Sequence, residues 1–254
     1  MLFTIITVVL DEYKELLETY ESIIAQDYKD IEWIVIHGGA GNEIPEFLNH
    51  CKSKMNVCFI SESDKGIYDA MNKGKGISKG EYVVFLNAGD LLHNNKVISK
   101  VFESITGSID LPDVVFGAAQ LVFNSGYSLI RHPKDMNNYI WHGLPANHQA
   151  TYYKRTSIID PAYDLKFKMC GDYYIISRMY MKNISGLYLD DVVVDFKIGG
   201  ASYHNPWLLI KEAYCIQKDV LNISLFVRLR SVLKRSISTF AVILIENGLY
   251  FKSK

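Results

Sequence analysis

Runs of apolar residues and amphipathic segments alternate along the first 40 residues of the chain. Residues 3 to 10, FTIITVVL, are apolar and rich in β-branched side chains, which is typical of a strand covered on both faces. In residues 11 to 27 the apolar positions Leu16, Leu17, Tyr20, Ile23 and Ile24 recur every three or four residues, which predicts an amphipathic helix. The run IEWIVIHGG predicts a second buried strand that ends at two glycines.

This β-α-β pattern predicts an α/β fold with a mostly parallel, Rossmann-like sheet. Ligands of such open sheets bind beyond the carboxyl ends of the strands. The loops at residues 11, 37 and 61–64 are therefore expected to share one crevice.

The remaining chain continues the pattern with lower regularity. EYVVFLNAGD, PDVVFGAAQLVF and residues 187–197 predict strands, and residues 173–182 predict a helix. Residues 127–160 mix aromatics, histidines and prolines, which favours an irregular region that faces the substrate. Residues after Pro206 have a helical pattern, so we place a boundary near residue 205, between a catalytic domain (1–205) and a helical extension (206–254).

Composition narrows the class of protein. With 254 residues, 49% of them hydrophobic, the chain can bury a large core, which excludes a disordered or fibrous protein. A formal net charge of −1 gives no support for a nucleic-acid partner. The N-terminus lacks the basic region of a signal peptide, so we expect a cytoplasmic protein. The four cysteines lie in apolar settings without C-x-x-C spacing and are interpreted as buried free thiols, in preference to a metal site or a disulfide: Cys51, Cys58, Cys170 and Cys215.

The segment SDKGIYDAMNKG, residues 63–74, carries charged groups beside permissive glycines. Glycine loops and helix N-termini offer free N–H groups, and lysines add positive charge, so the segment favours a ligand that contains phosphate. Neither a P-loop nor a dinucleotide fingerprint is present. Taken alone, Asp64 and Lys65 are better explained by a solvated helix cap.

Two further carboxylates have the same ambiguity. Asp90 follows a predicted strand in FLNAGD, where it suits a divalent cation bound with diphosphate oxygens, but this sequence is also an ordinary turn. Asp172 lies at the start of an apolar helix in MCGDYYIISRM, where it is either a helix cap or a general base.

Together these stretches resemble the family 2 glycosyltransferases, which are inverting enzymes with the GT-A fold that use nucleotide-sugar donors. The resemblance covers residues 3–203 and rests on TIITVVLDE, ESIIAQDYKDIEWIVIHGG, SESDKGIYDAMNKGKGISKGEYVVFLNAGD, ANHQATYYKR, GDYYIISRM and IGGAS, in the order and approximate spacing of that family. The chain is similar in particular to small transferases of bacterial surface polysaccharide (O-antigen, capsule or exopolysaccharide) assembly.

The resemblance implies a role for each matching residue. Asp90 matches the last acid of the D-x-D metal site, which binds Mn²⁺ or Mg²⁺. Asp172 matches the catalytic base, a task that His148 could share, although His148 is as well explained as a side chain that positions the acceptor. The expected donor-binding residues are Val9, Leu10, Asp11, Glu12, His37, Asp64, Lys65, Asn72, Asn87, Ala88 and Gly89.

Two residues depart from the family pattern. His37 stands where relatives have an acid that accepts a hydrogen bond from uracil, although a neutral imidazole nitrogen can also accept one. Asn87 replaces the first acid of D-x-D, so metal binding should depend more on the donor diphosphate.

The C-terminal segment LFVRLRSVLKRSISTFAVILI predicts a basic amphipathic helix. The residues on its apolar face are Leu225, Leu229, Val232, Leu233, Ile237, Phe240 and Leu244, and the cations Arg228, Arg230, Lys234 and Arg235 fall outside it. The helix either packs on the catalytic domain or binds an anionic membrane surface, and its apolar run is too short to span a bilayer.

The sequence therefore predicts transfer of a sugar, from a UDP-hexose, to a lipid-linked saccharide at the inner face of the cell membrane. Two alternatives remain: a nucleotidyltransferase on a similar sheet, which the acidic VVLDEYKE disfavours, and a non-catalytic sugar-nucleotide-binding module, which the retained Asp90 and Asp172 disfavour.

Overall fold

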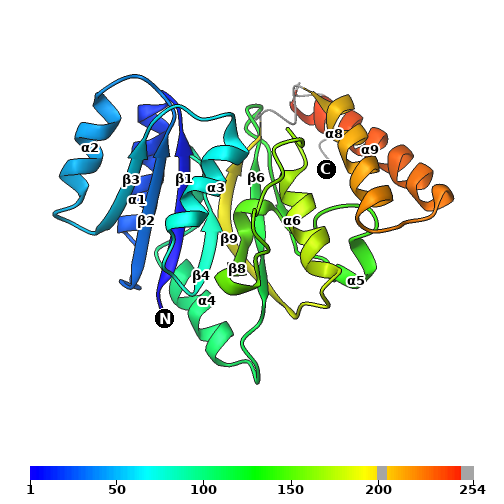
Figure 1. The fold of residues 1–254 in the computed structure, drawn as a ribbon, viewed down its shortest axis with the longest axis horizontal. Coiled ribbons are helices and arrows are strands. Elements are labelled where there is room, and N and C mark those ends of the chain that lie inside the picture. Colours follow the sequence, from blue (N-terminus) through cyan, green and yellow to red (C-terminus); the bar gives the residue numbers. More distant parts are fainter. Residues whose placement is uncertain (199–204, 247–254) are drawn as a thin grey trace.

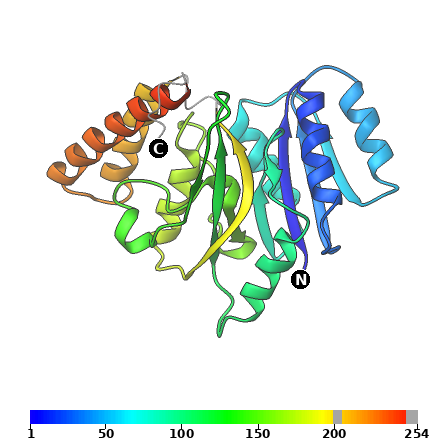
Figure 2. The same cartoon turned by 180° about the vertical axis from the view of Figure 1, so that it is seen from behind.

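The fold is a single curved sheet flanked by helices (Figures 1 and 2). The computed structural model describes residues 1–198 and 205–246, with side chains up to residue 241. The strands are β1 (Phe3–Val9), β2 (Ile31–His37), β3 (Asn56–Ser61), β4 (Tyr82–Phe85), β5 (Leu91–Leu92), β6 (Val114–Val122), β7 (Ser128–Arg131), β8 (Thr151–Lys154) and β9 (Gly186–Lys197). The helices are α1 (Tyr13–Ile24), α2 (Glu43–Cys51), α3 (Ile67–Ile77), α4 (Val97–Thr106), α5 (Met136–Tyr139), α6 (Gly171–Tyr180), α8 (Pro206–Asp219) and α9 (Leu225–Glu246).

The sheet has a parallel half and a mixed half. Its strand order is β3-β2-β1-β4-β8-β6-β9-β5, with β7 paired to β6. β1 runs parallel to β2 and β4, and β2 runs parallel to β3. β8 is antiparallel to both β4 and β6. The predicted β-α-β unit of the N-terminal half is confirmed, and its strand ends lie at one edge of the sheet.

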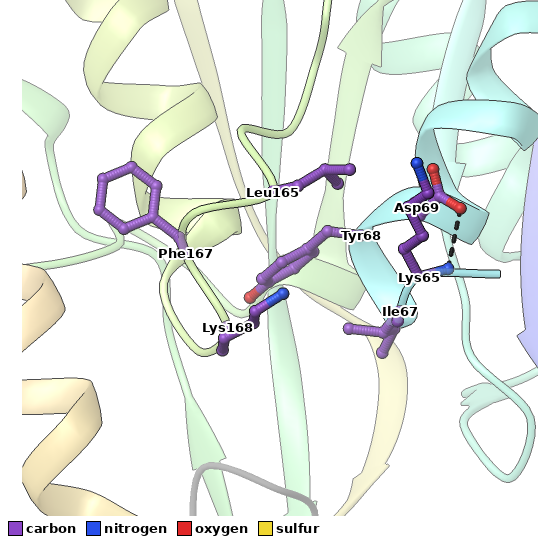
Figure 3. A pocket seen from close by; sticks show the side chains of 8 residues that line it. Lys65, Ile67, Tyr68, Asp69, Leu165, Phe167 and Lys168 are labelled. Carbon is purple, nitrogen blue, oxygen red and sulfur yellow. Dashed lines mark hydrogen bonds between the residues drawn. The ribbon is translucent and has the colours of Figure 1, made fainter.

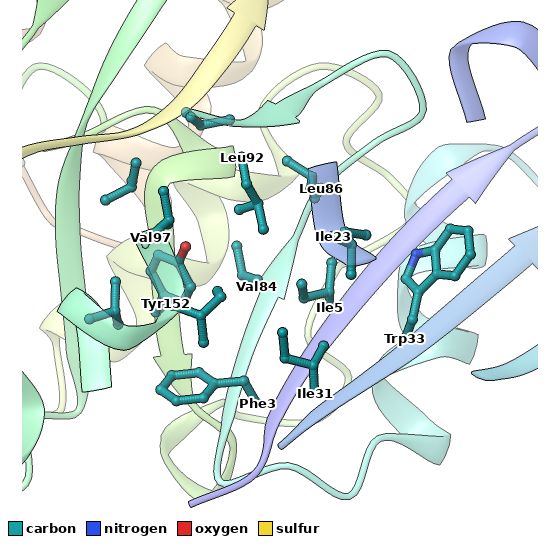
Figure 4. Close-up of a cluster of buried hydrophobic side chains, with 14 of the residues drawn as sticks. Phe3, Ile5, Ile23, Ile31, Trp33, Val84, Leu86, Leu92, Val97 and Tyr152 are labelled. Carbon is teal, nitrogen blue, oxygen red and sulfur yellow. The ribbon is translucent and has the colours of Figure 1, made fainter. Parts of the chain in front are cut away.

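Both faces of the parallel half are buried, as the continuous apolar runs predicted. Every residue of β2 is buried, because helices cover the sheet on both sides. One cluster of buried side chains packs between α1, α4 and the sheet; it includes Phe3, Ile5, Trp33, Val84 and Tyr152 (Figure 4). The indole N–H of Trp33 donates to Thr7 Oγ1 over 2.9 Å, whereas the buried hydroxyl of Tyr152 has no hydrogen-bond partner among the described residues.

The prediction that residues 127–160 form an irregular region was wrong in one important part. Thr151–Lys154 form β8, which lies in the centre of the sheet. Four residues are too few to show a period, and two of them are tyrosines with polar tips. The prediction that all four cysteines are buried was also wrong, because Cys58 is exposed on the edge strand β3; all four are free thiols.

The C-terminal helices pack against the segment that leads into α6. The carboxylate of Glu212 on α8 accepts hydrogen bonds from the backbone N–H groups of Lys168, Met169 and Cys170, at 2.8–3.0 Å. Residues after 205 therefore help to fix the start of α6. The boundary near residue 205 stays a prediction, and Gly199 to Ser202 of the IGGAS motif lie outside the described residues.

Candidate active site

Three loops meet at the carboxyl ends of β1, β2 and β3, as the sequence predicted. A Cβ atom built on Gly38 would lie 2.4 Å from Asp64 Oδ2, and one on Gly39 would lie 2.3 Å from Asp11 Oδ1. A Cβ on Gly39 would also lie 2.4 Å from the backbone carbonyl of Leu10, so a larger residue at position 39 would displace backbone, whereas at Gly38 it would displace only the ends of side chains. The structure thus brings Leu10, Asp11, His37 and Asp64 together, with Glu12 bonded back to the N–H of Leu10 over 3.0 Å.

His37 ends β2 beneath this glycine pair. Its Nδ1 is 2.8 Å from Ser61 Oγ. Its Nε2 is buried and has no hydrogen-bond partner among the described residues. Such an atom is costly to leave unpaired, by about 1–3 kcal/mol. The imidazole therefore offers one ring nitrogen to a group that the protein alone does not supply.

Two carboxylates hold the loop before α3, one from the loop itself and one from the first turn of the helix. Asp64 Oδ1 accepts from the N–H of Gly66 over 2.8 Å, and Asp69 Oδ2 accepts from the N–H of Lys65 over 2.9 Å. Gly66 has φ of 113°, a conformation that glycine adopts without strain. Neither Asp64 nor Lys65 occupies the N-cap position, which belongs to Gly66.

A cavity of about 140 Å³ opens beside this loop (Figure 3). Its wall comes from two distant parts of the chain: the first turn of α3 and the segment before α6. Tyr68 lies at its centre, with Leu165 and Phe167 on one side and Lys65 on the other (Figure 3). The Tyr68 ring also packs on Gly171, where a Cβ would come within 2.7 Å. The cavity therefore adjoins the start of α6.

The turn Asn87-Ala88-Gly89-Asp90 follows β4 at the same edge of the sheet. The N–H of Asp90 donates to the carbonyl of Asn87 over 3.1 Å, and Gly89 has φ of 89°, as a type II turn requires at its third position. Thr19 Oγ1 accepts from the N–H of Gly89 over 2.9 Å and lies 3.0 Å from the Asp90 carbonyl. The Glu15 carbonyl also accepts from the N–H of Gly89, over 3.2 Å, so α1 fixes the turn through one hydroxyl and one carbonyl.

The side chains of this turn suit a divalent cation. Asp90 is only 6% exposed. Burial raises the pKa of Asp90 to about 8, and hydrogen bonds from the Gln149 side chain and the Lys197 backbone oppose this rise. The Asn87 Oδ1 atom is buried without a donor. Oxygen ligands of this kind, one carboxylate and one amide, fit Mg²⁺ or Mn²⁺ that takes its other ligands from substrate phosphate and water. No cluster of three metal-ligating side chains occurs within residues 1–198 and 205–241.

Asp172 is the second residue of α6, and Cys170 occupies the N-cap position. Its Oδ1 accepts from the N–H of Tyr173 over 2.8 Å. Burial raises the pKa of Asp172 to about 6, and the hydrogen bond from Tyr173 and the charges of Arg235 and Arg131 oppose this rise. A carboxylate with this pKa is ionised at neutral pH and can still accept a proton, as a general base must.

His148 lies deeper in the fold. Its Nε2 is 3.0 Å from the Tyr163 hydroxyl and its Nδ1 is 3.3 Å from the Tyr153 hydroxyl. Burial lowers the pKa of His148 to about 4. The ring is therefore neutral, stacks on Phe85 and has both nitrogens engaged by tyrosines. The structure gives His148 a role in supporting these tyrosines, and it does not place a free nitrogen beside Asp172.

Asn72 also has all its side-chain atoms engaged within the protein. Its Nδ2 donates to the Tyr163 carbonyl and its Oδ1 accepts from the Tyr163 N–H, both over 2.9 Å. This pair joins α3 to the segment before α6. The structure therefore shows Asn72 bonded to Tyr163, and its role in donor binding stays a prediction.

Sequence reasoning missed the arginines near Asp172. Arg131 ends β7 and Arg235 lies on α9, 41 residues before and 63 residues after Asp172 in the sequence. Arg235 donates to the His142 carbonyl, and its guanidinium carbon lies 5.6 Å from the centre of the Tyr173 ring. No local motif marks these residues, because they come from separate elements that meet only in the folded chain.

Comparison with known proteins agrees with this fold. The model of glycosyl transferase family 2 matches residues 4–178. An uncharacterized glycosyltransferase of Mycobacterium tuberculosis is 29% identical over 180 residues, which cover 69% of this chain and 67% of the relative. A PGL/p-HBAD biosynthesis glycosyltransferase of Mycobacterium bovis is 27% identical over 176 residues, which cover 68% of this chain and 67% of the relative.

Two solved structures share the fold. Residues 1–349 of Staphylococcus aureus TarS superpose with a TM-score of 0.69 at 18% identity. The superposition covers 100% of this chain and 76% of the TarS chain. The mannosyltransferase PcManGT of Pyrobaculum calidifontis, in complex with GDP-Man and Mn²⁺, gives a TM-score of 0.63 at 15% identity. This superposition covers 97% of this chain and 79% of the PcManGT chain. The chain belongs to glycosyl transferase family 2. It has the GT-A fold and is a glycosyltransferase.

Proposed function

We propose that this glycosyltransferase moves a hexose from a UDP-sugar to a lipid-linked saccharide in bacterial surface polysaccharide synthesis, by a single inverting displacement. The observation that carries the proposal is the arrangement of Asp64, Asp90 and Asp172 around one edge of the sheet, each positioned by its own backbone contacts. Related structures contain UDP-GlcNAc in TarS and GDP-Man in PcManGT, which supports a nucleotide-sugar donor.

The His37 nitrogen supports uracil as the donor base. Uracil carries a ring N–H, and the unpartnered Nε2 atom of His37 accepts it in the tautomer whose Nδ1–H donates to Ser61 Oγ. Because Gly39 covers this nitrogen, the bond requires the glycine pair to move aside when the donor binds, which glycine permits at low steric cost.

Asp172 accounts for the chemistry at the acceptor. The acceptor oxygen forms a bond to the anomeric carbon, the bond from that carbon to the donor phosphate breaks with its electron pair, and the hydroxyl proton passes to the carboxylate of Asp172. One displacement inverts the configuration at the anomeric carbon. A divalent cation, when bound by Asp90 and Asn87, would offset the negative charge of the departing diphosphate.

A panel of nucleotide sugars tests this proposal. The purified protein is incubated with each donor, Mn²⁺ or Mg²⁺ and a bacterial membrane lipid extract, and the products are identified by mass. We expect UDP-hexose to yield a glycosylated lipid and the Asp172→Asn variant to yield none. Nucleotidyl transfer, or tight donor binding with neither transfer nor hydrolysis, would instead establish one of the two alternatives.

The orientation of α9 supports action at a membrane. The sequence left packing and membrane binding as alternatives, and the structure shows the helix packed on the domain through its polar side. Ser231 is fully buried between His142 and Gln217, and Arg228 lies 4.6 Å from the Tyr214 ring centre. The opposite face is apolar and 55–79% exposed, at Leu225, Phe226, Leu229, Leu233, Ile237 and Phe240. We call these six residues the outer face of α9.

An anionic bilayer is the occupant that best fits the outer face of α9. From residue 225 to 241 the helix contains four cations and no acid, and Arg230 and Lys234 are exposed beside the outer face. An apolar strip flanked by cations is typical of helices that lie in the membrane interface. No helix of the described residues is long and apolar enough to cross a bilayer.

Sedimentation with vesicles tests this orientation. We expect binding to vesicles that contain anionic lipid, and loss of binding when Leu229 and Leu233 are both changed to Glu. Ile109→Glu is the matched control, because Ile109 is fully exposed on the loop after α4. If both variants bind like the wild type, the outer face is not a membrane surface. If wild-type protein does not bind vesicles but is dimeric and the double variant is monomeric, a second copy of the chain is the occupant.

A further inference from the structure

Four cations gather around His142, next to Asp172. Arg131 donates to the Leu144 carbonyl over 2.9 Å and to Asn147 Oδ1 over 3.3 Å. Arg235 donates to the His142 carbonyl. The ammonium groups of Lys134 and Lys234 lie 4.3 and 5.5 Å from the Tyr139 ring centre. These residues, here called the basic cluster, come from β7, the loop after it and α9, so the fold assembles them from separate elements.

The basic cluster has more positive charge than its surroundings balance. Within the described part of the chain, none of the four side chains forms an ion pair with a carboxylate. Backbone carbonyls, an amide and aromatic rings hold them instead. The pKa of His142 is lowered to about 3 by burial and by the four cations together. Arg235 lies against the ring of Tyr173, the residue after Asp172, and the charges of Arg235 and Arg131 both lower the pKa of Asp172.

The guanidinium of Arg235 has hydrogen-bonding capacity in reserve. It donates one hydrogen bond, to His142, whereas its Nε is buried without an acceptor among the described residues. Arginine offers five N–H donors in a planar fork that matches phosphate oxygens. A buried guanidinium that lacks hydrogen-bond acceptors lowers the stability of the fold. The presence of Arg235 near Asp172 therefore needs an explanation.

We propose that the basic cluster binds a phosphate group of the acceptor, with Arg235 as its main ligand. This inference rests on the proposed function, in which the acceptor is a saccharide linked to a lipid, and it specifies the link as a phosphate or diphosphate. Since the basic cluster is adjacent to Asp172, the sugar that receives the new residue is the one attached to that phosphate. For a diphosphate link, the reaction that supplies this substrate transfers a sugar phosphate to a lipid phosphate; for a single phosphate, it transfers a sugar to a lipid phosphate.

The position of α9 is consistent with this arrangement. The helix presents Arg235 toward Asp172 and its outer face away from the domain. The diphosphate of a lipid-linked sugar lies at the surface of the bilayer, where the lipid chain enters it. A helix that lies in this surface would place Arg235 at the depth where the diphosphate emerges.

Binding of inorganic pyrophosphate, measured by calorimetry in EDTA, tests the site without any sugar transfer. Arg235→Gln should weaken pyrophosphate binding about 10- to 100-fold, the range for a lost hydrogen bond between charged groups. Lys134→Gln, at the exposed rim, should weaken it by a smaller factor and serves as the second variant if Arg235→Gln fails to fold. Arg155→Gln is the matched control, because Arg155 also donates to a backbone carbonyl, that of Gly80, far from the basic cluster. Equal binding by all these proteins would overturn the proposal.

A second assay separates this inference from the proposed function. A lipid-diphosphate saccharide is compared with the same saccharide carrying a neutral methyl group in place of the diphosphate. Arg235→Gln should raise KM at least tenfold for the first acceptor and leave KM for the second unchanged, whereas any change in kcat that arises through the pKa of Asp172 should be the same for both acceptors. A fall in kcat for both with no change in either KM would mean that Arg235 acts only through Asp172. If the wild type uses neither acceptor but Arg235 still controls pyrophosphate binding, the proposed function fails and the anion site remains.

Discussion

Replacing Asp172 by Asn should raise stability at neutral pH while it removes activity. The pKa of this carboxyl is raised from 3.8 to about 6, and each pH unit corresponds to about 1.4 kcal/mol. Ionised Asp172 therefore costs the folded state up to about 3 kcal/mol above pH 6. Asparagine has no charge to bury, and its oxygen can still accept from the N–H of Tyr173.

The sign of the pH dependence follows from proton binding. Between pH 4 and 6 the folded protein holds a proton on Asp172 that the unfolded chain has released, so the wild type loses stability as the pH rises through this window. The variant lacks this contribution, and all other titrating groups cancel in the difference. We therefore expect the free energy of unfolding of Asp172→Asn, minus that of the wild type, to increase by up to about 3 kcal/mol from pH 4 to pH 6.5 and then to stay constant.

Denaturant titrations of both proteins at four or five pH values measure this difference, and the transfer rate is measured on the same preparations. The rate should fall at least about 100-fold at pH 7.5, because an amide does not accept the acceptor proton. A difference in stability that is the same at pH 4 and pH 7 would refute the burial argument. Transfer at close to the wild-type rate would refute the assignment of Asp172 as the base.

Three further predictions concern the same edge of the sheet. The wild-type kcat/KM should fall tenfold per pH unit below about pH 6, because protonated Asp172 is not a base; a profile that is flat to pH 5 would contradict this. Asp90→Asn should keep its melting temperature and lose the stimulation of donor turnover by Mn²⁺ or Mg²⁺, and a metal response equal to that of the wild type would remove the assigned cation site. Thr19→Val removes the shorter of the two hydrogen bonds from the N–H of Gly89 and leaves its bond to the Glu15 carbonyl at 3.2 Å, so it should lower the free energy of unfolding by about 0.5–1.5 kcal/mol and weaken donor binding; unchanged values would show that the Thr19 hydroxyl is not needed to hold the turn.

Sequence patterns predicted the parallel half of the sheet, because the long apolar runs in that part of the chain are typical only of buried strands. β1, α1 and β2 lie where the apolar pattern placed them, within a few residues at each end. The patterns failed for β8, which is four residues long and joins the two halves of the sheet. They also did not predict the orientation of α9, because an amphipathic sequence does not determine which face of the helix packs on the domain. Aromatic rings at Tyr139, Trp141 and Tyr173 hold the cations of α9 against the domain, and this leaves the apolar side exposed.

The candidate site was predictable only where its residues are close in sequence. Asp64 and Asp90 lie in short motifs whose order carries information, and the structure places both at the expected edge of the sheet. Asn72 belongs to the first of these motifs, yet its amide is bonded to Tyr163, a contact between residues 91 positions apart. The sequence shows which residues are present in a motif, but only the fold shows which of their polar atoms remain available.

The paired hydrogen bonds between Asn72 and Tyr163 connect the two substrates. Asn72 lies on α3, whose preceding loop carries Asp64. Tyr163 stacks on Tyr68 at 4.8 Å and leads toward α6 and Asp172. We therefore expect that a movement of the Asp64 loop on donor binding would displace the segment that holds Asp172. Coupling of this kind is reciprocal: the factor by which bound donor changes acceptor affinity equals the factor by which bound acceptor changes donor affinity.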